Sequence, residues 1–184
     1  MVDQVETMGA MLMACVQGAI AEMDPTIAPQ EICFRVGQEV PYDADLYFDL
    51  CCRGLAYVAL GDIWPSSASF PEQDINRQAS AVCYPPAWGV QWKVGIIRCA
   101  PVGTDTSMPT CEEWTSAYMK QIADAAALRR LSCCFRAAIR STVEFRGLGV
   151  IIDRQVQTNP QGGCIERYVT FSVQMTNCDC AGQV

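Results

Sequence analysis

The chain has 184 residues, of which 51% are hydrophobic and 18% are charged, and its 13 basic and 20 acidic residues give a formal charge of −7. This length suffices for one domain with an apolar core and is short for two, so we expect residues 1–184 to form a single domain. The acidic balance argues against a protein that grips nucleic acid, because phosphate neutralisation takes clustered Lys and Arg. No run approaches the ~20 apolar residues of a membrane span, and the N-terminus lacks a signal-peptide pattern, so we expect synthesis in the cytoplasm and no membrane partner.

The first part of the chain predicts a helix followed by two strands. Apolar residues recur at three- and four-residue spacing over residues 5–23, which is typical of an amphipathic helix, and Asp24-Pro25 ends the pattern. A short strand is expected over 31–36. A turn or irregular loop over 41–49 and a second strand over 55–64, closed by Pro65, follow it.

The middle of the chain contains the clearest strand. After a long loop expected over 66–86, apolar Trp88, Val90, Trp92, Val94 and Ile96 alternate with other residues. A period of two places these side chains on one face and predicts a half-buried strand that runs to about Cys99.

A long helix is expected to begin just after Thr110. The Thr110 hydroxyl and the Glu113 carboxylate have the spacing of a capping box, in which each side chain bonds the backbone of the other residue. The helix should run to about Ile139. Its apolar stripe is expected to comprise Trp114, Tyr118, Ile122, Ala125, Leu128, Leu131 and Phe135.

The last part predicts a hairpin, because strand-like segments over 143–156 and 164–175 flank the turn-forming residues 159–163. The order of elements therefore predicts an α+β fold. Its sheet should be mostly antiparallel, with the N-terminal helix and one long central helix packed on it.

The residue types argue against an enzyme. The chain has no histidine, which excludes Ser-His and Cys-His nucleophiles and every His-containing metal site. Gly147-Leu148-Gly149 lacks the third glycine of a phosphate-binding loop, and Asp43, Asp45 and Asp49 lack the pattern of a calcium loop. We therefore expect no catalytic residue, no cofactor and no metal ion.

The twelve cysteines are interpreted mainly as reduced, buried structural thiols. No pair has the two-residue spacer with which two thiolates commonly share one zinc ion. Two alternatives stay open. One is disulfide formation in the mature particle, with Cys51 or Cys52 and the terminal Cys178 and Cys180 as the candidates, and the other is a four-cysteine metal site.

Several short motifs resemble neck proteins of long-tailed actinobacterial, mycobacteriophage-like phages. They are Asp49-Leu50-Cys51-Cys52, Gly54-Leu55-Ala56-Tyr57-Val58, Trp64-Pro65-Ser66, Trp88-Gly89-Val90 and Arg98-Cys99-Ala100-Pro101, and with the cysteine-bearing helix near Cys133 they cover roughly residues 30–140. Proteins of this kind are similar to tail terminators, which have an α/β fold. The resemblance implies a structural virion protein whose hexameric ring caps the tail tube and joins it to the head connector.

The resemblance also implies the partners and the location. The ring would contact further copies of the chain, the tail tube protein and a head-side stopper or connector, and an acidic lumen would let genomic DNA pass without specific binding. The chain would be located in the tail or neck of the virion. Candidate interface residues are Trp64, Phe70, Trp88, Asn159 and Gly162, although the loops that carry three of them could equally be ordinary surface loops.

Two other functions compete with the terminator. One is another neck component, either a head-completion stopper, which a mainly β-barrel structure would favour, or a connector adaptor, which a helix-dominated structure would favour. The other is a cysteine-based redox or metal-binding enzyme, which would need a reactive thiolate beside a positive group.

Overall fold

The computed structural model describes residues 3–37, 51–67, 69–73, 87–103, 107–161 and 163–175. The described elements, in chain order, are α1 (Gln4–Ala21), β1 (Glu31–Arg35), β2 (Leu55–Ser66), β3 (Ala87–Cys99), α3 (Cys111–Ser141), a 3-10 helix (Val143–Phe145), β4 (Val150–Ile152), β5 (Val156–Gln157) and β6 (Cys164–Met175). Residues 51–53, which precede β2, are helical.

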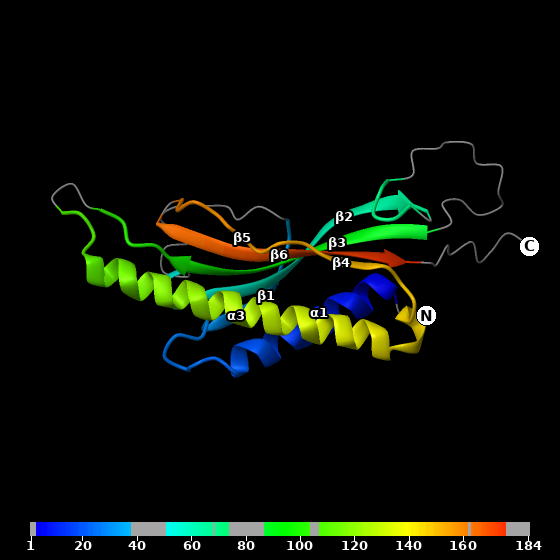
Figure 1. Ribbon diagram of the computed structural model, residues 1–184, viewed down its shortest axis with the longest axis horizontal. Helices are drawn as coiled ribbons and strands as arrows, with labels where there is room; N and C mark the ends of the chain where they lie inside the picture. The colour runs from blue at the N-terminus through cyan, green and yellow to red at the C-terminus, as the bar shows by residue number, and fades with distance from the viewer. Residues whose placement is uncertain are drawn as a thin grey trace, which may run out of the picture.

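One sheet of six strands carries both helices on the same face (Figure 1). Its order is β1-β2-β3-β6-β4, and β5 also pairs with β6. The β1–β2 pair is parallel and the other pairs are antiparallel. The predicted α+β fold, with a mostly antiparallel sheet, an N-terminal helix and one long helix, is confirmed.

The main core lies between the helices and the sheet. Asp3 caps α1 by accepting a hydrogen bond from the backbone N–H of Val5, and α1 then buries Met8, Leu12 and Val16. On the facing side, the ring of Phe135 on α3 meets the ring of Phe171 on β6 edge-on, with centroids 5.3 Å apart. Burying these apolar faces against each other is the main stabilising contribution to the fold.

The predicted capping box at the start of α3 is confirmed. The Thr110 hydroxyl accepts a hydrogen bond from the backbone N–H of Glu113 at 3.2 Å, and the Glu113 carboxylate accepts one from the backbone N–H of Thr110 at 2.7 Å. The hydrogen bonds that the Glu113 carboxylate accepts from the backbone N–H and from the hydroxyl of Thr110 hold the pKa of Glu113 below its ordinary value.

The predicted apolar stripe of α3 divides into two parts. Leu128, Leu131 and Phe135 are buried as expected, whereas Trp114, Tyr118 and Ile122 are 48%, 64% and 45% exposed. The apolar stripe is therefore covered only in the C-terminal half of the helix. The buried residues of α3 begin only at Gln121, because α1 packs beside the C-terminal half.

The central strand β3 is buried on both faces, so the expectation of a half-buried strand was wrong. The face toward the helices carries Trp92 and Val94, and the opposite face joins a second apolar cluster with Tyr57, Ile97 and Cys164. β3 lies between β2 and β6, so side chains of both neighbouring strands pack beside its own on each face.

The segment predicted as one strand over 143–156 forms three short elements. Val143–Phe145 is a 3-10 helix, Gly147 adopts a positive φ of 90°, and only β4 and β5 pair with β6. β2, in contrast, continues past its predicted end through Pro65. Proline is tolerated there because β1 ends opposite Ala59, so among the described strands the far half of β2 pairs with β3 alone.

Among the described residues, neither helix combines the length and the apolar character that crossing a bilayer would require.

Candidate functional site

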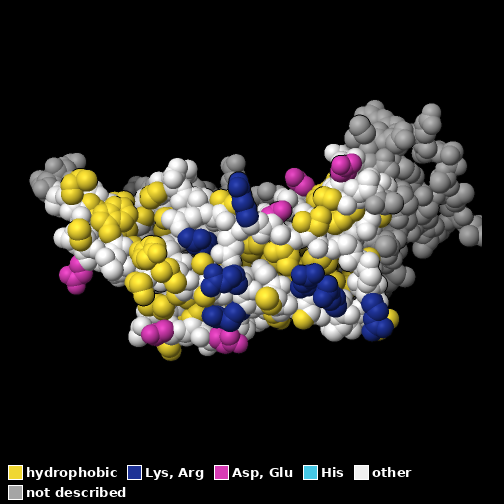
Figure 2. Space-filling view, in the orientation of Figure 1, with side chains coloured by type: hydrophobic (Ala, Val, Ile, Leu, Met, Phe, Trp, Pro, Cys, Tyr) yellow, Lys and Arg dark blue, Asp and Glu magenta, His cyan; other side chains and the backbone are white. Residues whose placement is uncertain are grey.

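The N-terminal half of α3 presents an apolar surface, here called the α3 patch, made of Trp114, Tyr118, Met119 and Ile122. Trp114, Tyr118 and Ile122 are four residues apart, so they share one side of the helix. Figure 2 shows hydrophobic side chains gathered over this end of α3. An exposed apolar cluster of this kind is typical of a protein-binding surface.

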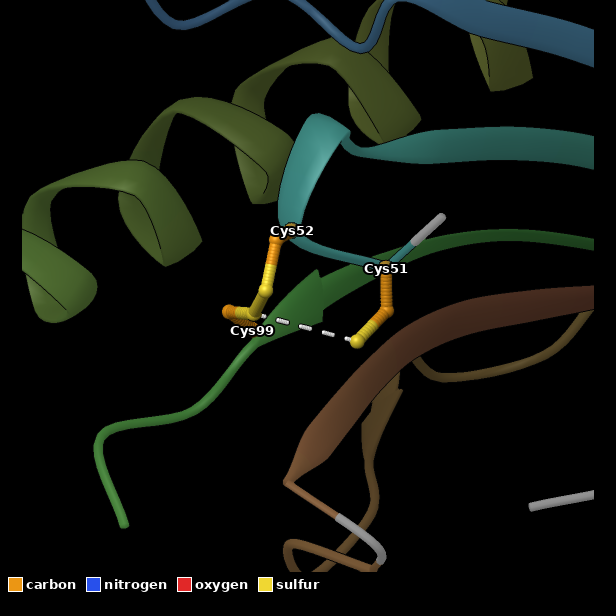
Figure 3. A group of neighbouring side chains, drawn as sticks. All are labelled: Cys51, Cys52 and Cys99. Atoms are coloured by element: carbon orange, nitrogen blue, oxygen red, sulfur yellow. Dashed lines mark hydrogen bonds between the residues drawn. A yellow bond between two sulfur atoms is a disulfide. The ribbon is translucent and has the colours of Figure 1, made fainter. Parts of the chain in front are cut away.

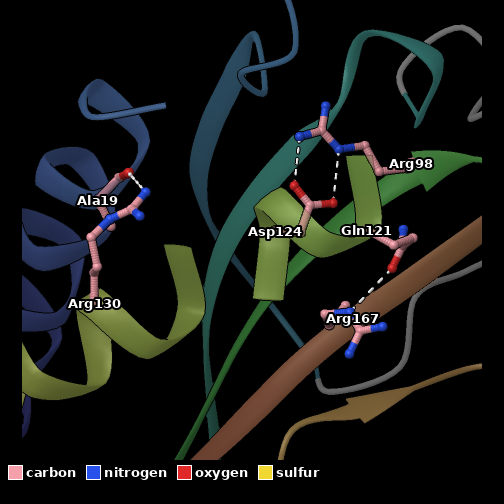
Figure 4. A network of polar contacts seen from close by, with 6 residues as sticks. All are labelled: Ala19, Arg98, Gln121, Asp124, Arg130 and Arg167. Atoms are coloured by element: carbon pink, nitrogen blue, oxygen red, sulfur yellow. Dashed lines mark hydrogen bonds and ion pairs between the residues drawn. The ribbon is translucent and has the colours of Figure 1, made fainter. Parts of the chain in front are cut away.

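A groove of about 330 Å³ lies beside the α3 patch. Its apolar wall comes from Ala100 and Pro101, which follow β3, and from Ile165 on β6. Its polar wall is held in place by Arg167, whose Nε donates to Oε1 of Gln121 at 3.2 Å (Figure 4). The groove thus combines an apolar wall with fixed hydrogen-bonding groups, a combination common at binding sites.

The C-terminal half of α3 is basic. Arg129, Arg136 and Arg140 are exposed and share one side of the helix with exposed Cys133. Arg130 instead turns toward α1, where it pairs with Glu22 at 3.1 Å and donates to the carbonyl of Ala19 at 3.3 Å (Figure 4). The long helix therefore offers an apolar half and a basic half on the surface of an acidic chain.

A second apolar surface, the edge patch, lies on β1, at the residue that follows it and on the neighbouring strand β2. It consists of Phe34, Val36, Leu60 and Ile63, which are exposed by 39% or more. β1 is the terminal strand of the sheet, so its outer backbone edge has no neighbouring strand among the described elements. An apolar edge strand is a site where another chain can pack.

A buried ion pair fixes α3 to β3. The Arg98 guanidinium donates to both carboxylate oxygens of Asp124, at 3.0 and 2.6 Å, and Asp124 is fully buried (Figure 4). Burial raises the pKa of Asp124, and the hydrogen bonds and charge of Arg98 oppose that rise only in part. Sequence analysis missed this pair, because a lone Asp in a helix and a lone Arg in a strand carry no signal of contact.

A second polar cluster lies on the other face of the sheet. Lys93 on β3 pairs with the buried carboxylate of Glu166 on β6 at 2.9 Å, and the Tyr57 hydroxyl donates to the same carboxylate. The Lys93 ammonium also lies 4.1 Å from the ring centroid of Tyr168. These contacts neutralise a buried glutamate and link β2, β3 and β6 on this face of the sheet.

Three disulfides are present among the described residues, which differs from the expected reduced thiols. Cys15 on α1 is bonded to Cys134 on α3, Cys51 to Cys164, and Cys52 to Cys99. Cys51 and Cys52 were candidates for disulfides, but their partners were not. Cys178 and Cys180 lie outside the described residues.

The last two disulfides lie against each other. The Sγ atoms of Cys51 and Cys99, which belong to different disulfides, are 3.9 Å apart (Figure 3). Cys99 and Cys164 are direct cross-strand partners in the β3–β6 ladder, so their side chains lie on the same face of the sheet. Sequence spacing could not reveal this cluster, because strand register is set by long-range pairing.

The predicted interface residues are only partly brought together. Trp64 and Phe70 stack with ring planes 4° apart, and the Trp64 Nε1 donates to the Pro71 carbonyl at 3.2 Å. Trp88 is half-buried against the main core, and Asn159 is exposed. Gly162, Asp43, Asp45 and Asp49 and residues 74–86 of the predicted loop lie outside the described residues. The role of these residues at an interface stays a prediction.

Neither a protein-family model nor a curated protein sequence matches this chain.

Proposed function

We propose that this chain is a non-enzymatic assembly protein, a tail terminator whose copies form a ring that caps a phage tail tube and joins it to the head connector. The observation that carries the proposal is the presence of two separate apolar surfaces, the α3 patch and the edge patch. A closed ring uses two different surfaces of each subunit, one for each neighbour, whereas a twofold dimer needs only one.

The α3 patch has the composition of the centre of a protein interface. Trp114, Tyr118 and Met119 belong to the residue types enriched in such interfaces. Because the neighbouring groove is lined by Gln121 and Arg167, a docked chain would find hydrogen-bond partners as well as apolar contact. We propose that this half of α3 packs on the edge patch of the next copy.

The fold supports the terminator over the other neck components. The described chain has a mixed sheet covered by two helices, so it is neither mainly a β-barrel, as a head-completion stopper would be, nor dominated by helices, as a connector adaptor would be. In the proposed mechanism no covalent bond is made or broken. Binding of the ring buries the last edges of the tube, ends its growth and offers the head side a new surface.

The proposal is tested by electron microscopy of the purified protein, alone and with isolated tail tubes. We expect hexameric rings or caps on tube ends for the wild type. Tyr118→Glu and Phe34→Glu, which place a charge in one patch each, should both abolish rings and caps. Val143→Glu is the matched control, because Val143 is 78% exposed but lies outside both patches.

Mixing the two variants tests the ring contact itself. Each variant keeps one intact patch, so an equimolar mixture of Tyr118→Glu and Phe34→Glu should form heterodimers and no rings, measured by light scattering after size exclusion. Rings that persist in both variants would contradict the proposed contact. Dodecameric rings, or binding to heads while tubes stay bare, would favour the connector adaptor or the stopper.

A further inference from the structure

We propose that Cys51, Cys52, Cys99 and Cys164 form a zinc site when their thiols are reduced, and that the two disulfides are the oxidised, metal-free form of the same site. The inference is independent of the assembly function and departs from the expectation that the chain binds no metal. It rests on the convergence of four sulfur atoms from three parts of the fold.

The fold, not the sequence spacing, gathers these ligands. Cys51 and Cys52 lie on the helical turn before β2, Cys99 ends β3, and Cys164 begins β6. The Gly54 N–H donates to the Cys51 carbonyl at 3.1 Å and closes this turn. Gly54 has a positive φ of 81°, and a Cβ atom there would lie 2.7 Å from the Arg98 guanidinium. The turn that presents both cysteines therefore requires glycine.

The sulfur positions fit one coordination sphere. The Sγ atoms of Cys51, Cys52 and Cys99 all lie within 4.8 Å of one another, and Cys164 is bonded to Cys51. In a tetrahedral site with Zn–S bonds of about 2.3 Å, neighbouring sulfurs are about 3.8 Å apart. The 3.9 Å between the Cys51 and Cys99 sulfurs, which no covalent bond imposes, is close to that spacing.

The ligand set suits zinc. Four thiolates are a common ligand set for structural zinc, and the chain has no histidine to form a mixed site. Cys51 and Cys164 are buried and would hold two ligands in place, whereas Cys52 is exposed and Cys99 is partly exposed. The exposed side gives a reductant and the metal ion a route to the sulfurs.

The interconversion balances with a phosphine as the reductant. Each disulfide takes two electrons from one phosphine, which becomes a phosphine oxide with an oxygen atom from water, and the two water protons give two thiols. Two phosphines therefore yield four thiols. One Zn²⁺ then binds the four sulfurs and releases four protons, because the thiolate is the ligand form.

The test uses the full chain, reduced anaerobically with a phosphine and then titrated with Co²⁺ or Zn²⁺. We expect one ion per chain by native mass spectrometry, and Co²⁺ absorption bands typical of tetrahedral thiolate ligation that disappear when Zn²⁺ is added. Cys52→Ser and Cys99→Ser should each weaken Zn²⁺ binding by more than about tenfold, since loss of a mere outer-shell contact already costs that much.

Matched controls change cysteines outside the cluster. Cys111→Ser and Cys133→Ser remove exposed free thiols. A Cys83→Ser/Cys178→Ser/Cys180→Ser variant removes the three cysteines that lie outside the described residues, and all of these variants should keep the wild-type ion content. A second measurement does not depend on variants that fold: Zn²⁺ should protect the four cluster cysteines of the reduced wild type from alkylation. No bound ion, unchanged binding in Cys52→Ser and Cys99→Ser, or protection of other cysteines would overturn the proposal.

Discussion

Asp124 on α3 and Arg98 on β3 form a two-bonded ion pair in which the carboxylate is fully buried and the arginine is only 5% exposed. The pair joins the long helix to the centre of the sheet, next to the point where α3 passes from its exposed apolar half to its buried half. It therefore fixes the position from which the α3 patch projects.

Removing one member of this pair should destabilise the protein strongly. We expect Arg98→Met to lower the free energy of unfolding by about 3–5 kcal/mol, because it leaves the Asp124 charge buried without a partner. The double variant Arg98→Met/Asp124→Leu should recover most of that loss. Urea denaturation of the wild type, the two single variants and the double variant measures the coupling free energy between Arg98 and Asp124.

The exposed Arg130–Glu22 pair is the matched control for this cycle. Arg130 and Glu22 are 40% and 67% exposed, so Arg130→Met should cost no more than about 1 kcal/mol. A loss in Arg98→Met as small as that of the control would contradict the structural role of the buried pair.

The buried carboxyl of Asp124 should also give the stability a pH dependence of defined sign. Burial raises its pKa in the folded protein, so between the unfolded and folded pKa values the native state holds a proton that the unfolded chain has released. The stability that the native state gains from this proton is fully present below the unfolded pKa of Asp124 and is lost as pH rises through its folded pKa. The free energy of unfolding of the wild type should therefore fall relative to Asp124→Asn as pH rises through that interval. If the free energy of unfolding of the wild type instead rises relative to that of Asp124→Asn over this interval, Arg98 lowers the pKa of Asp124 by more than burial raises it.

The Cys15–Cys134 disulfide should stabilise the contact between α1 and α3. It closes a loop of 119 residues, and a cross-link of this kind typically contributes about 2–4 kcal/mol by restricting the unfolded chain. Cys15→Ala/Cys134→Ser should lose about that amount under oxidising conditions and should differ little from the wild type in the presence of a phosphine reductant. Cys111→Ser, which removes an exposed free thiol, should leave the unfolding transition unchanged. A difference that persists after reduction would point to lost packing at Cys15 instead.

Gly95 provides a test of packing on the second face of the sheet. A Cβ atom at this position would lie 2.8 Å from the ring of Tyr57, which is 1% exposed and bonded to Glu166. Gly95→Ala should therefore cost about 1–3 kcal/mol in thermal or urea unfolding. Gly18→Ala is the opposite case, because nothing lies within 4 Å of a Cβ there and α1 is helical, so it should stabilise by up to about 1 kcal/mol. Equal effects of the two substitutions would contradict this account.

Much of the fold could be predicted from the sequence, because local patterns of residues determine where helices and strands form. The period of Trp88, Val90 and Trp92 placed β3, and the spacing of Thr110 and Glu113 placed the first residue of α3. These signals depend on neighbouring residues alone, through strand alternation and helix capping. The order of such elements was enough to predict an α+β fold.

Tertiary structure decided which patterned surfaces are covered and which residues from distant segments meet. Trp114 and Leu128 belong to the same helical pattern, yet only Leu128 is buried, because α1 covers only the C-terminal half of α3. The contact between Cys51 and Cys99 depends on the register of strands far apart in the chain, and neighbouring residues carry no information about it. Local periodicity sets the side of an element on which a residue lies, and only the packed fold determines what lies opposite.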